Sequence, residues 1–148
     1  MTSYCSRILL VASLAACVDC AGPPIPHEPD VADMTLSAPA DEVRTALIQV
    51  LTDGGYDVEQ EGDEHWTTDY REEIPGPWNW LLRWRFGTGR SRVDALLTAA
   101  DSKTSRLRLQ VDYEGKDGLF TRWEDAPTPL AHSATNQLRL IKNALHLL

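Results

Sequence analysis

The side chains most often used in catalysis are scattered along this 148-residue sequence rather than grouped. The four histidines lie far apart, and none has a second ligand at a metal-binding spacing; they are His27, His65, His132 and His146. Zinc and iron sites usually combine histidine and cysteine ligands at short, regular intervals. The sequence therefore predicts no metal site, and only a cluster assembled by the fold would provide one.

Two other segments resemble catalytic motifs without completing them. Gly87-Thr88-Gly89-Arg90-Ser91 lacks the lysine and the spacing of a phosphate-binding loop, which favours a connection between strands. The acidic run Glu59 to Glu64 lacks the closing glutamate of a calcium loop, which favours a solvated turn. No Gly-x-Ser-x-Gly nucleophile motif is present. We expect no enzymatic activity and no cofactor; a hydrolase assembled from distant residues is a remaining alternative.

Cys17 lies in the one context that indicates a definite chemical modification. An apolar run from Ile8 to Ala16 follows a short polar start with Arg7, as in an export signal. The run is too short to cross a bilayer, which takes roughly 20 residues. Leu14-Ala15-Ala16-Cys17 resembles the lipobox of bacterial lipoproteins. In that family the cysteine thiol receives a diacylglyceryl group, the signal is cut just before it, and the new amine is usually acylated.

The lipobox resemblance implies that residues 1–16 are a signal peptide and that the covalent lipid on Cys17 anchors the protein to a membrane. Val18 stands where an aspartate would favour inner-membrane retention, so we expect the periplasmic face of the outer membrane. Cys20 follows charged Asp19 and is a poor lipid site. It is expected to be either a free thiol or part of an intermolecular bridge.

The charge of the chain argues against nucleic-acid binding. Removing residues 1–16 deletes one base and no acid, so the net charge changes from −8 to −9. Nucleic acids and anionic lipids attract a positive field. Acids prevail from Glu28 to Glu73 and bases from Arg83 to Arg122, which suggests two faces of opposite sign.

Residues 17–33 are expected to form a proline-rich tether, and residues 34–148 a single α+β domain. Helical spacing predicts a first helix capped by Ser37 and ended by Gly54 and Gly55, and a second from Ala134 to Leu147. Apolar and polar residues alternate at 56–60, 65–70, 82–86, 93–97 and 106–113, which together with a short strand at 34–36 predicts about five strands. The order β-α-β-β-β-β-α predicts an antiparallel sheet with both helices on one face.

The succession of these elements, with Asp53-Gly54-Gly55-Tyr56-Asp57-Val58 and His65-Trp66-Thr67-Thr68-Asp69-Tyr70, resembles the helix-grip domain of BamC-type outer-membrane lipoproteins. The resemblance spans residues 34–148. Such lipoproteins are accessory subunits of the outer-membrane β-barrel assembly machinery, and the assembly subunit has two domains where this chain has one. The resemblance therefore implies the fold rather than membership of that machinery.

Trp78, Trp80 and Trp84 lie in and after a proline-broken segment that cannot be one long regular element. Tryptophan is favoured at binding interfaces and membrane surfaces, but these rings could equally cover an open edge of the core. Six arginines could likewise line a solvated sheet face or dock an acidic partner: Arg83, Arg85, Arg90, Arg92, Arg106 and Arg108. The leading hypothesis is a non-enzymatic lipoprotein that binds or scaffolds another envelope protein. The alternative is a periplasmic carrier of a small molecule or lipid in an apolar cavity between helices and sheet.

Overall fold

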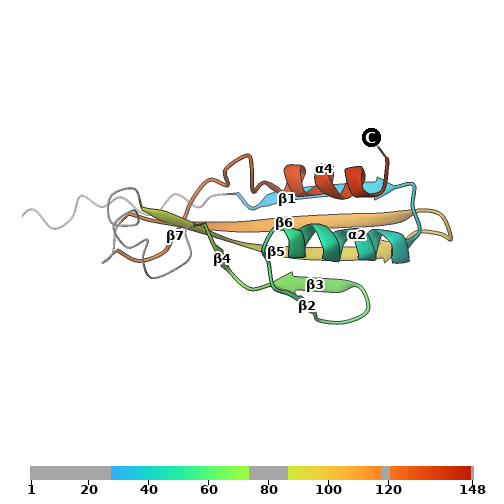
Figure 1. The fold of residues 1–148 in the computed structure, drawn as a ribbon, viewed down its shortest axis with the longest axis horizontal. Coiled ribbons are helices and arrows are strands. Elements are labelled where there is room, and N and C mark those ends of the chain that lie inside the picture. The colour runs from blue at the N-terminus through green and yellow to red at the C-terminus, as the bar shows by residue number, and fades with distance from the viewer. Residues whose placement is uncertain (1–27, 74–86, 118–120, 148) are drawn as a thin grey trace, which may run out of the picture.

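The computed structural model describes residues 28–73, 87–117 and 121–147. The elements are β1 (Asp30–Leu36), α2 (Ala40–Asp53), β2 (Val58–Gln60), β3 (His65–Thr68), β4 (Arg71–Glu72), β5 (Thr88–Ala99), β6 (Ser105–Lys116), β7 (Glu124–Asp125) and α4 (Ala134–Ala144). The strands form one antiparallel sheet in the order β1-β6-β5-β3-β2, with β4 also paired to β5 and β7 to β6. Both helices cover the same face of this sheet (Figure 1). The predicted α+β class and its antiparallel sheet with two helices are confirmed.

The sheet has seven strands rather than about five. The two additional strands have two residues each: β4 continues the line of β3 along β5, and β7 continues the line of β1 along β6. Such short strands carry no alternating pattern. β1 begins at Asp30, so it includes four residues assigned to the tether. Thr88 to Ser91 belong to β5, which corrects their interpretation as a connection, whereas the alternation at 82–86 lies outside the described residues.

The first predicted helix is present but is capped differently. Its N-cap is Pro39 with an extended backbone and no side-chain hydrogen bond, so the expectation that Ser37 caps it was wrong. Proline suits a helix start because it has no N–H to satisfy there. Gly54 and Gly55 end the helix as predicted, and Gly55 has a φ of 81°, a left-handed conformation that glycine adopts without steric cost.

The second helix is capped by Ser133, whose hydroxyl accepts a hydrogen bond from the Asn136 N–H at 3.2 Å. It ends at Ala144, earlier than predicted, and His146 just beyond has a φ of 55°. The turn between β5 and β6 is closed by Asp101, whose carboxylate accepts hydrogen bonds from Lys103 N and from Thr104 N and Oγ1. These bonds lower the pKa of Asp101, and they account for the predicted antiparallel pairing of the two long strands.

The core lies between the helices and the sheet. Every second residue is buried from Gly89 to Leu97 in β5 and from Ser105 to Val111 in β6. Val93, Leu107 and Leu109 of these strands and Val43 and Leu47 of α2 belong to one buried core. The interface between helices and sheet is thus filled by side chains. No described helix is long and apolar enough to cross a membrane.

Candidate functional site

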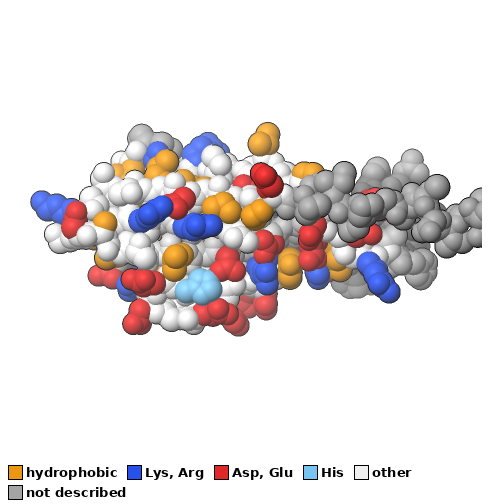
Figure 2. Space-filling view, turned by 180° about the vertical axis from the view of Figure 1, so that it is seen from behind, with side chains coloured by type: hydrophobic (Ala, Val, Ile, Leu, Met, Phe, Trp, Pro, Cys, Tyr) orange, Lys and Arg blue, Asp and Glu red, His pale blue; other side chains and the backbone are white. Residues whose placement is uncertain are grey.

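The open face of the sheet carries alternating charges rather than a field of one sign. Arg90 donates to Glu114 at 2.6 Å and Arg92 to Asp112 at 2.7 Å, each from a residue of β5 to its direct partner on β6. Figure 2, the view from behind, shows basic and acidic side chains side by side on this face. Of the six arginines predicted here, Arg83 and Arg85 lie outside the described residues.

At the edge of this face, Arg106 binds Asp33 of β1 through two hydrogen bonds of 2.8 Å and lowers the pKa of its carboxyl. The carboxylates of β1 and β6 therefore neutralise Arg90, Arg92 and Arg106 locally. Acids remain in excess along the β2–β3 hairpin, at the lower edge in Figure 2. The two faces of opposite sign suggested by the sequence do not form within the described residues.

An alternating stack of aromatic rings and guanidinium groups lies at the β4–β7 end of the sheet. Arg90 lies 4.2 Å from the Tyr70 ring centroid and 4.4 Å from that of Trp123, and Arg92 lies 5.2 Å from Tyr70. Cation–π contacts of this kind rigidify a surface and fix long side chains. The sequence did not indicate this cluster, because its members are distant in the chain.

The predicted partner-binding tryptophans, Trp78, Trp80 and Trp84, and the predicted lipidation site Cys17 lie outside the described residues. The residues that flank them are described. Glu72 pairs with Arg90 near the start of β5, and β1 begins opposite Val111 on β6. The segment 74–86 and the N-terminal region therefore join the domain at the same end of the sheet, to the left in Figure 1.

A pocket of about 1040 Å³ opens at this end, between the start of α4, the residues that precede it, and the edge of β6. β1 covers that edge only as far as Val111, and β7 begins to cover it at Glu114. Pro29 and Pro127 flank the gap. Because proline has no N–H to add to a ladder, neither segment can extend its pairing across the gap.

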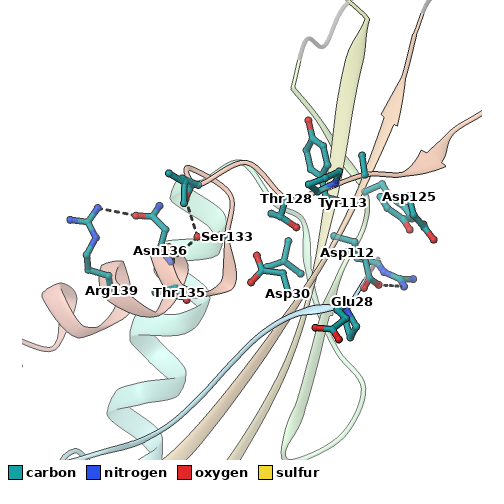
Figure 3. Close-up of a pocket in the computed structure, with 17 residues that line it drawn as sticks. Glu28, Asp30, Asp112, Tyr113, Asp125, Thr128, Ser133, Thr135, Asn136 and Arg139 are labelled. Atoms are coloured by element: carbon teal, nitrogen blue, oxygen red, sulfur yellow. Dashed lines mark hydrogen bonds and ion pairs between the residues drawn. The ribbon is translucent and has the colours of Figure 1, made fainter. Parts of the chain in front are cut away.

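The pocket is lined by polar and apolar groups together. Figure 3 shows Glu28, Asp112 and Asp125 on the sheet side, and Asp30 between the sheet and α4. Asp30 accepts a hydrogen bond of 3.0 Å from the Ala134 N–H, so it stabilises the start of α4. The site is thus built by a strand start, a strand edge and a helix start.

Tyr113 connects the pocket to Glu73, the residue that directly precedes the segment 74–86 and that we call its root. Its hydroxyl donates to Glu73 Oε1 at 2.9 Å, and His132 Nε2 lies 3.3 Å from the same oxygen. The rings of Tyr113 and His132 are nearly parallel, with centroids 6.5 Å apart. Glu73 is therefore held by β6 and by the connection before α4.

Two of the described histidines, His65 and His132, bind carboxylates. His65 lies between Asp94, which its Nε2 contacts, and Glu61, whose Oε2 is 3.3 Å from its Nδ1. Among the described residues no group of three or more histidine, cysteine, aspartate or glutamate side chains could hold a metal ion. His27 lies outside them. We assign His65 and His132 to positioning of neighbouring strands.

Burial, together with the Glu73 carboxylate, raises the pKa of Tyr113 from 10.0 to about 12. A raised pKa means that the neutral phenol is favoured by folding, so its contribution to stability is complete below pH 10 and is lost as the pH rises toward 12. Tyr113→Phe removes this proton. We predict that its free energy of unfolding falls less than that of the parent protein between about pH 9 and about pH 11, measured by urea denaturation.

Tyr70, whose pKa is raised by burial and by Glu114, keeps part of the dependence in both proteins. Equal slopes for the parent and Tyr113→Phe would contradict the assignment. At neutral pH the variant should lose about 1 kcal/mol, because one hydrogen bond is removed while His132 still binds Glu73.

These features define an α+β domain with a filled core, an ion-paired sheet face and a polar pocket at one end of the sheet. No family model and no curated protein matches the sequence. Among solved structures, a conserved protein from Geobacillus kaustophilus matches with a TM-score of 0.41 and 13% identity, over 78% of this chain and 93% of that one.

Two further structures match with a TM-score of 0.32. The Zhui aromatase/cyclase from Streptomyces sp. R1128 has 13% identity over 80% of this chain and 84% of its own. An uncharacterised protein from Bacillus thuringiensis has 9% identity over 81% of this chain and 95% of its own. Similarities at this level carry no argument about activity.

Proposed function

We propose that the protein is a lipid-anchored envelope lipoprotein that binds another envelope protein without catalysing a reaction. The lipid is placed on Cys17, in the lipobox-like Leu14-Ala15-Ala16-Cys17. The partner is placed at the β4–β7 end of the sheet. We place the protein at the periplasmic face of the outer membrane, because Val18 follows the lipidated cysteine where an aspartate would favour inner-membrane retention.

One observation carries the proposal. The strand register brings the roots of the tryptophan segment, Glu73 and Gly87, to the end of the sheet at which Glu28 enters the domain. A protein anchored to the membrane through its N-terminal tether would present the tryptophans on the side of the domain that faces the membrane. There they would meet a partner in the same membrane, because both are confined to it.

A double variant tests this function. Trp78→Ala combined with Trp80→Ala should reduce recovery of the partner by at least about tenfold, because buried tryptophans dominate interface energies. The measurement is crosslinking in intact cells followed by quantitative mass spectrometry of co-purified envelope proteins. Asn79→Ala, within the same segment, is the matched control and should leave recovery unchanged.

Equal recovery of the partner with the double variant and with Asn79→Ala would show that Trp78 and Trp80 do not contribute to the interface. A lipid-free chain carrying Cys17→Ser provides a further arm. If partner recovery is lost with Cys17→Ser while both segment variants retain it, membrane placement alone determines the association.

A small-molecule carrier is the second candidate, and the pocket beside Asp30 favours it. The form of this alternative changes, however. The space between helices and sheet is filled by the core, so a carried molecule would bind in the mixed pocket at the end of the sheet.

A further inference from the structure

We propose that the pocket at the end of the sheet binds an organic cation, an ammonium or guanidinium group on an apolar carrier. This inference goes beyond the proposed function, because it needs neither the lipid nor the tryptophan segment. All the residues that carry it are described.

The cavity has the size of a ligand site. Its volume of about 1040 Å³ lies just above the range for small-molecule pockets, about 300 to 1000 Å³. It exists because β1 and β7 leave the edge of β6 uncovered at Asp112. The pocket is thus bounded by two strand ends and a helix start.

The lining of the pocket is negatively charged, and two of its carboxylates have no partner among the described side chains. Four carboxylates, those of Glu28, Asp30, Asp112 and Asp125, line the pocket with only two bases, Arg92 and Arg139. Asp112 is already paired with Arg92, and Asp30 accepts from Ala134 N. Within the part of the chain that the structure describes, Glu28 and Asp125 form no side-chain hydrogen bond or ion pair.

The two arginines do not make the pocket an anion site. Arg92 is held by Asp112, and Arg139 donates to the side-chain oxygen of Asn136 at 2.9 Å. An anionic ligand would therefore meet two unpaired carboxylates and no free guanidinium pair. A cation would instead pair with the carboxylates of Glu28 and Asp125, which Figure 3 shows on the sheet side of the pocket.

The remaining wall selects an apolar carrier. Pro29, Ala126 and Pro127 contribute apolar surface, and Leu130 at the rim is 88% exposed. A large exposed aliphatic side chain beside carboxylates fits a ligand that covers it while its charge reaches the acids. A bare metal ion lacks such a surface, and no metal-binding group was found among the described side chains.

The cation could be a free amine or a basic side chain of a peptide. Two probes distinguish these sources: hexylammonium and the capped tripeptide acetyl-Leu-Lys-Leu-amide. Binding is measured on the isotope-labelled full chain carrying Cys17→Ser, by amide chemical shifts on titration. Hexanoate, which has the opposite charge, is the ligand control. We expect at least one cationic probe, and not hexanoate, to shift the amides of Val111, Ala126 and Leu130.

Glu28→Gln combined with Asp125→Asn tests the carboxylates, and the pair should weaken binding by about tenfold or more. Glu59→Gln combined with Asp63→Asn, on the β2–β3 hairpin, changes the net charge equally and should change binding by less than about twofold. All four side chains are exposed, so both proteins should keep the parent melting temperature.

The tighter of the two cationic probes identifies the source of the ligand. Equal weakening by both double variants would show general charge attraction and overturn the site. The absence of pocket shifts with both cations, or equal shifts with hexanoate, would overturn it as well. Because neither Trp78 nor the lipid is involved, failure here leaves the proposed function untouched.

Discussion

Replacing Cys17 by serine is expected to abolish fatty-acid incorporation into the protein. A hydroxyl cannot form the thioether of a lipoprotein, and the sequence holds no other cysteine in a lipobox-like context. The measurement is growth with a labelled fatty acid, followed by intact-mass determination of the purified chain. Label in the variant should fall to the background of an unlipidated protein.

The effect should be large because acyl chains alone supply the expected anchor. Each buried methylene contributes about 0.8 kcal/mol, and a single chain binds only marginally, whereas several chains on one residue hold a protein durably. No described helix could span the membrane in their place. We therefore also expect the label-free variant to be released from washed membranes.

Cys20→Ser is the matched control, since it removes a thiol three residues away. This variant should retain the label and the mass of a diacylated or triacylated chain cut before Cys17. Label retained by Cys17→Ser but lost by Cys20→Ser would show that Cys20, rather than Cys17, carries the lipid. Absence of label from the parent protein would show that the protein is not lipidated, and would contradict the predicted membrane location.

Elements whose side chains face one uniform environment could be predicted from the sequence. In α2 the apolar residues Val43, Ala46, Leu47 and Leu51 recur at helical spacing, and all four are buried. In β6 the alternation of Leu107, Leu109 and Val111 with polar residues matches one buried and one open face. Local periodicity determines these elements because each has one partner surface.

The pocket could not be predicted because it depends on where two distant strands stop. Pro29 and Pro127 belong to segments at opposite ends of the domain sequence, and only their common neighbour β6 brings them together. The same holds for Glu73 and Tyr113, which are separated by 40 residues. Proline within a strand-like segment signals an end to pairing, but it does not tell which strand is left uncovered.

Gly89 is expected to be the least replaceable glycine of the sheet. A methyl group added there would lie 1.9 Å from the hydroxyl oxygen of Tyr113 and 3.0 Å from Glu73 Cδ. Tyr113 is diagonal to Gly89 across β5 and β6, since Gly89 pairs with Gly115. The ring of Tyr113 must therefore shift away from Glu73 in Gly89→Ala. We expect a loss of about 2 to 3 kcal/mol, from overpacking together with a broken hydrogen bond.

Gly115→Ala is the matched control because it lies directly opposite on β6, where a methyl group would meet only Ala126 Cβ at 3.4 Å. Its stability should change by less than about 0.5 kcal/mol. Urea denaturation of both variants measures the difference, with the parent protein as reference.

The cause of the Gly89 effect is tested by removing the ring. In a Tyr113→Ala background the phenol is gone and the methyl group of Gly89→Ala meets the Glu73 carboxyl carbon at 3.0 Å, so the second substitution should cost at least about 1 kcal/mol less than in the parent. Additive losses would mean that the close approach of Tyr113 is not what excludes a side chain. A coupled result would instead explain why a glycine stands near the start of the paired strand β5, where its backbone freedom is otherwise destabilising. The glycine gives Tyr113 the room to cross β5 and hold Glu73 at the root of the tryptophan segment.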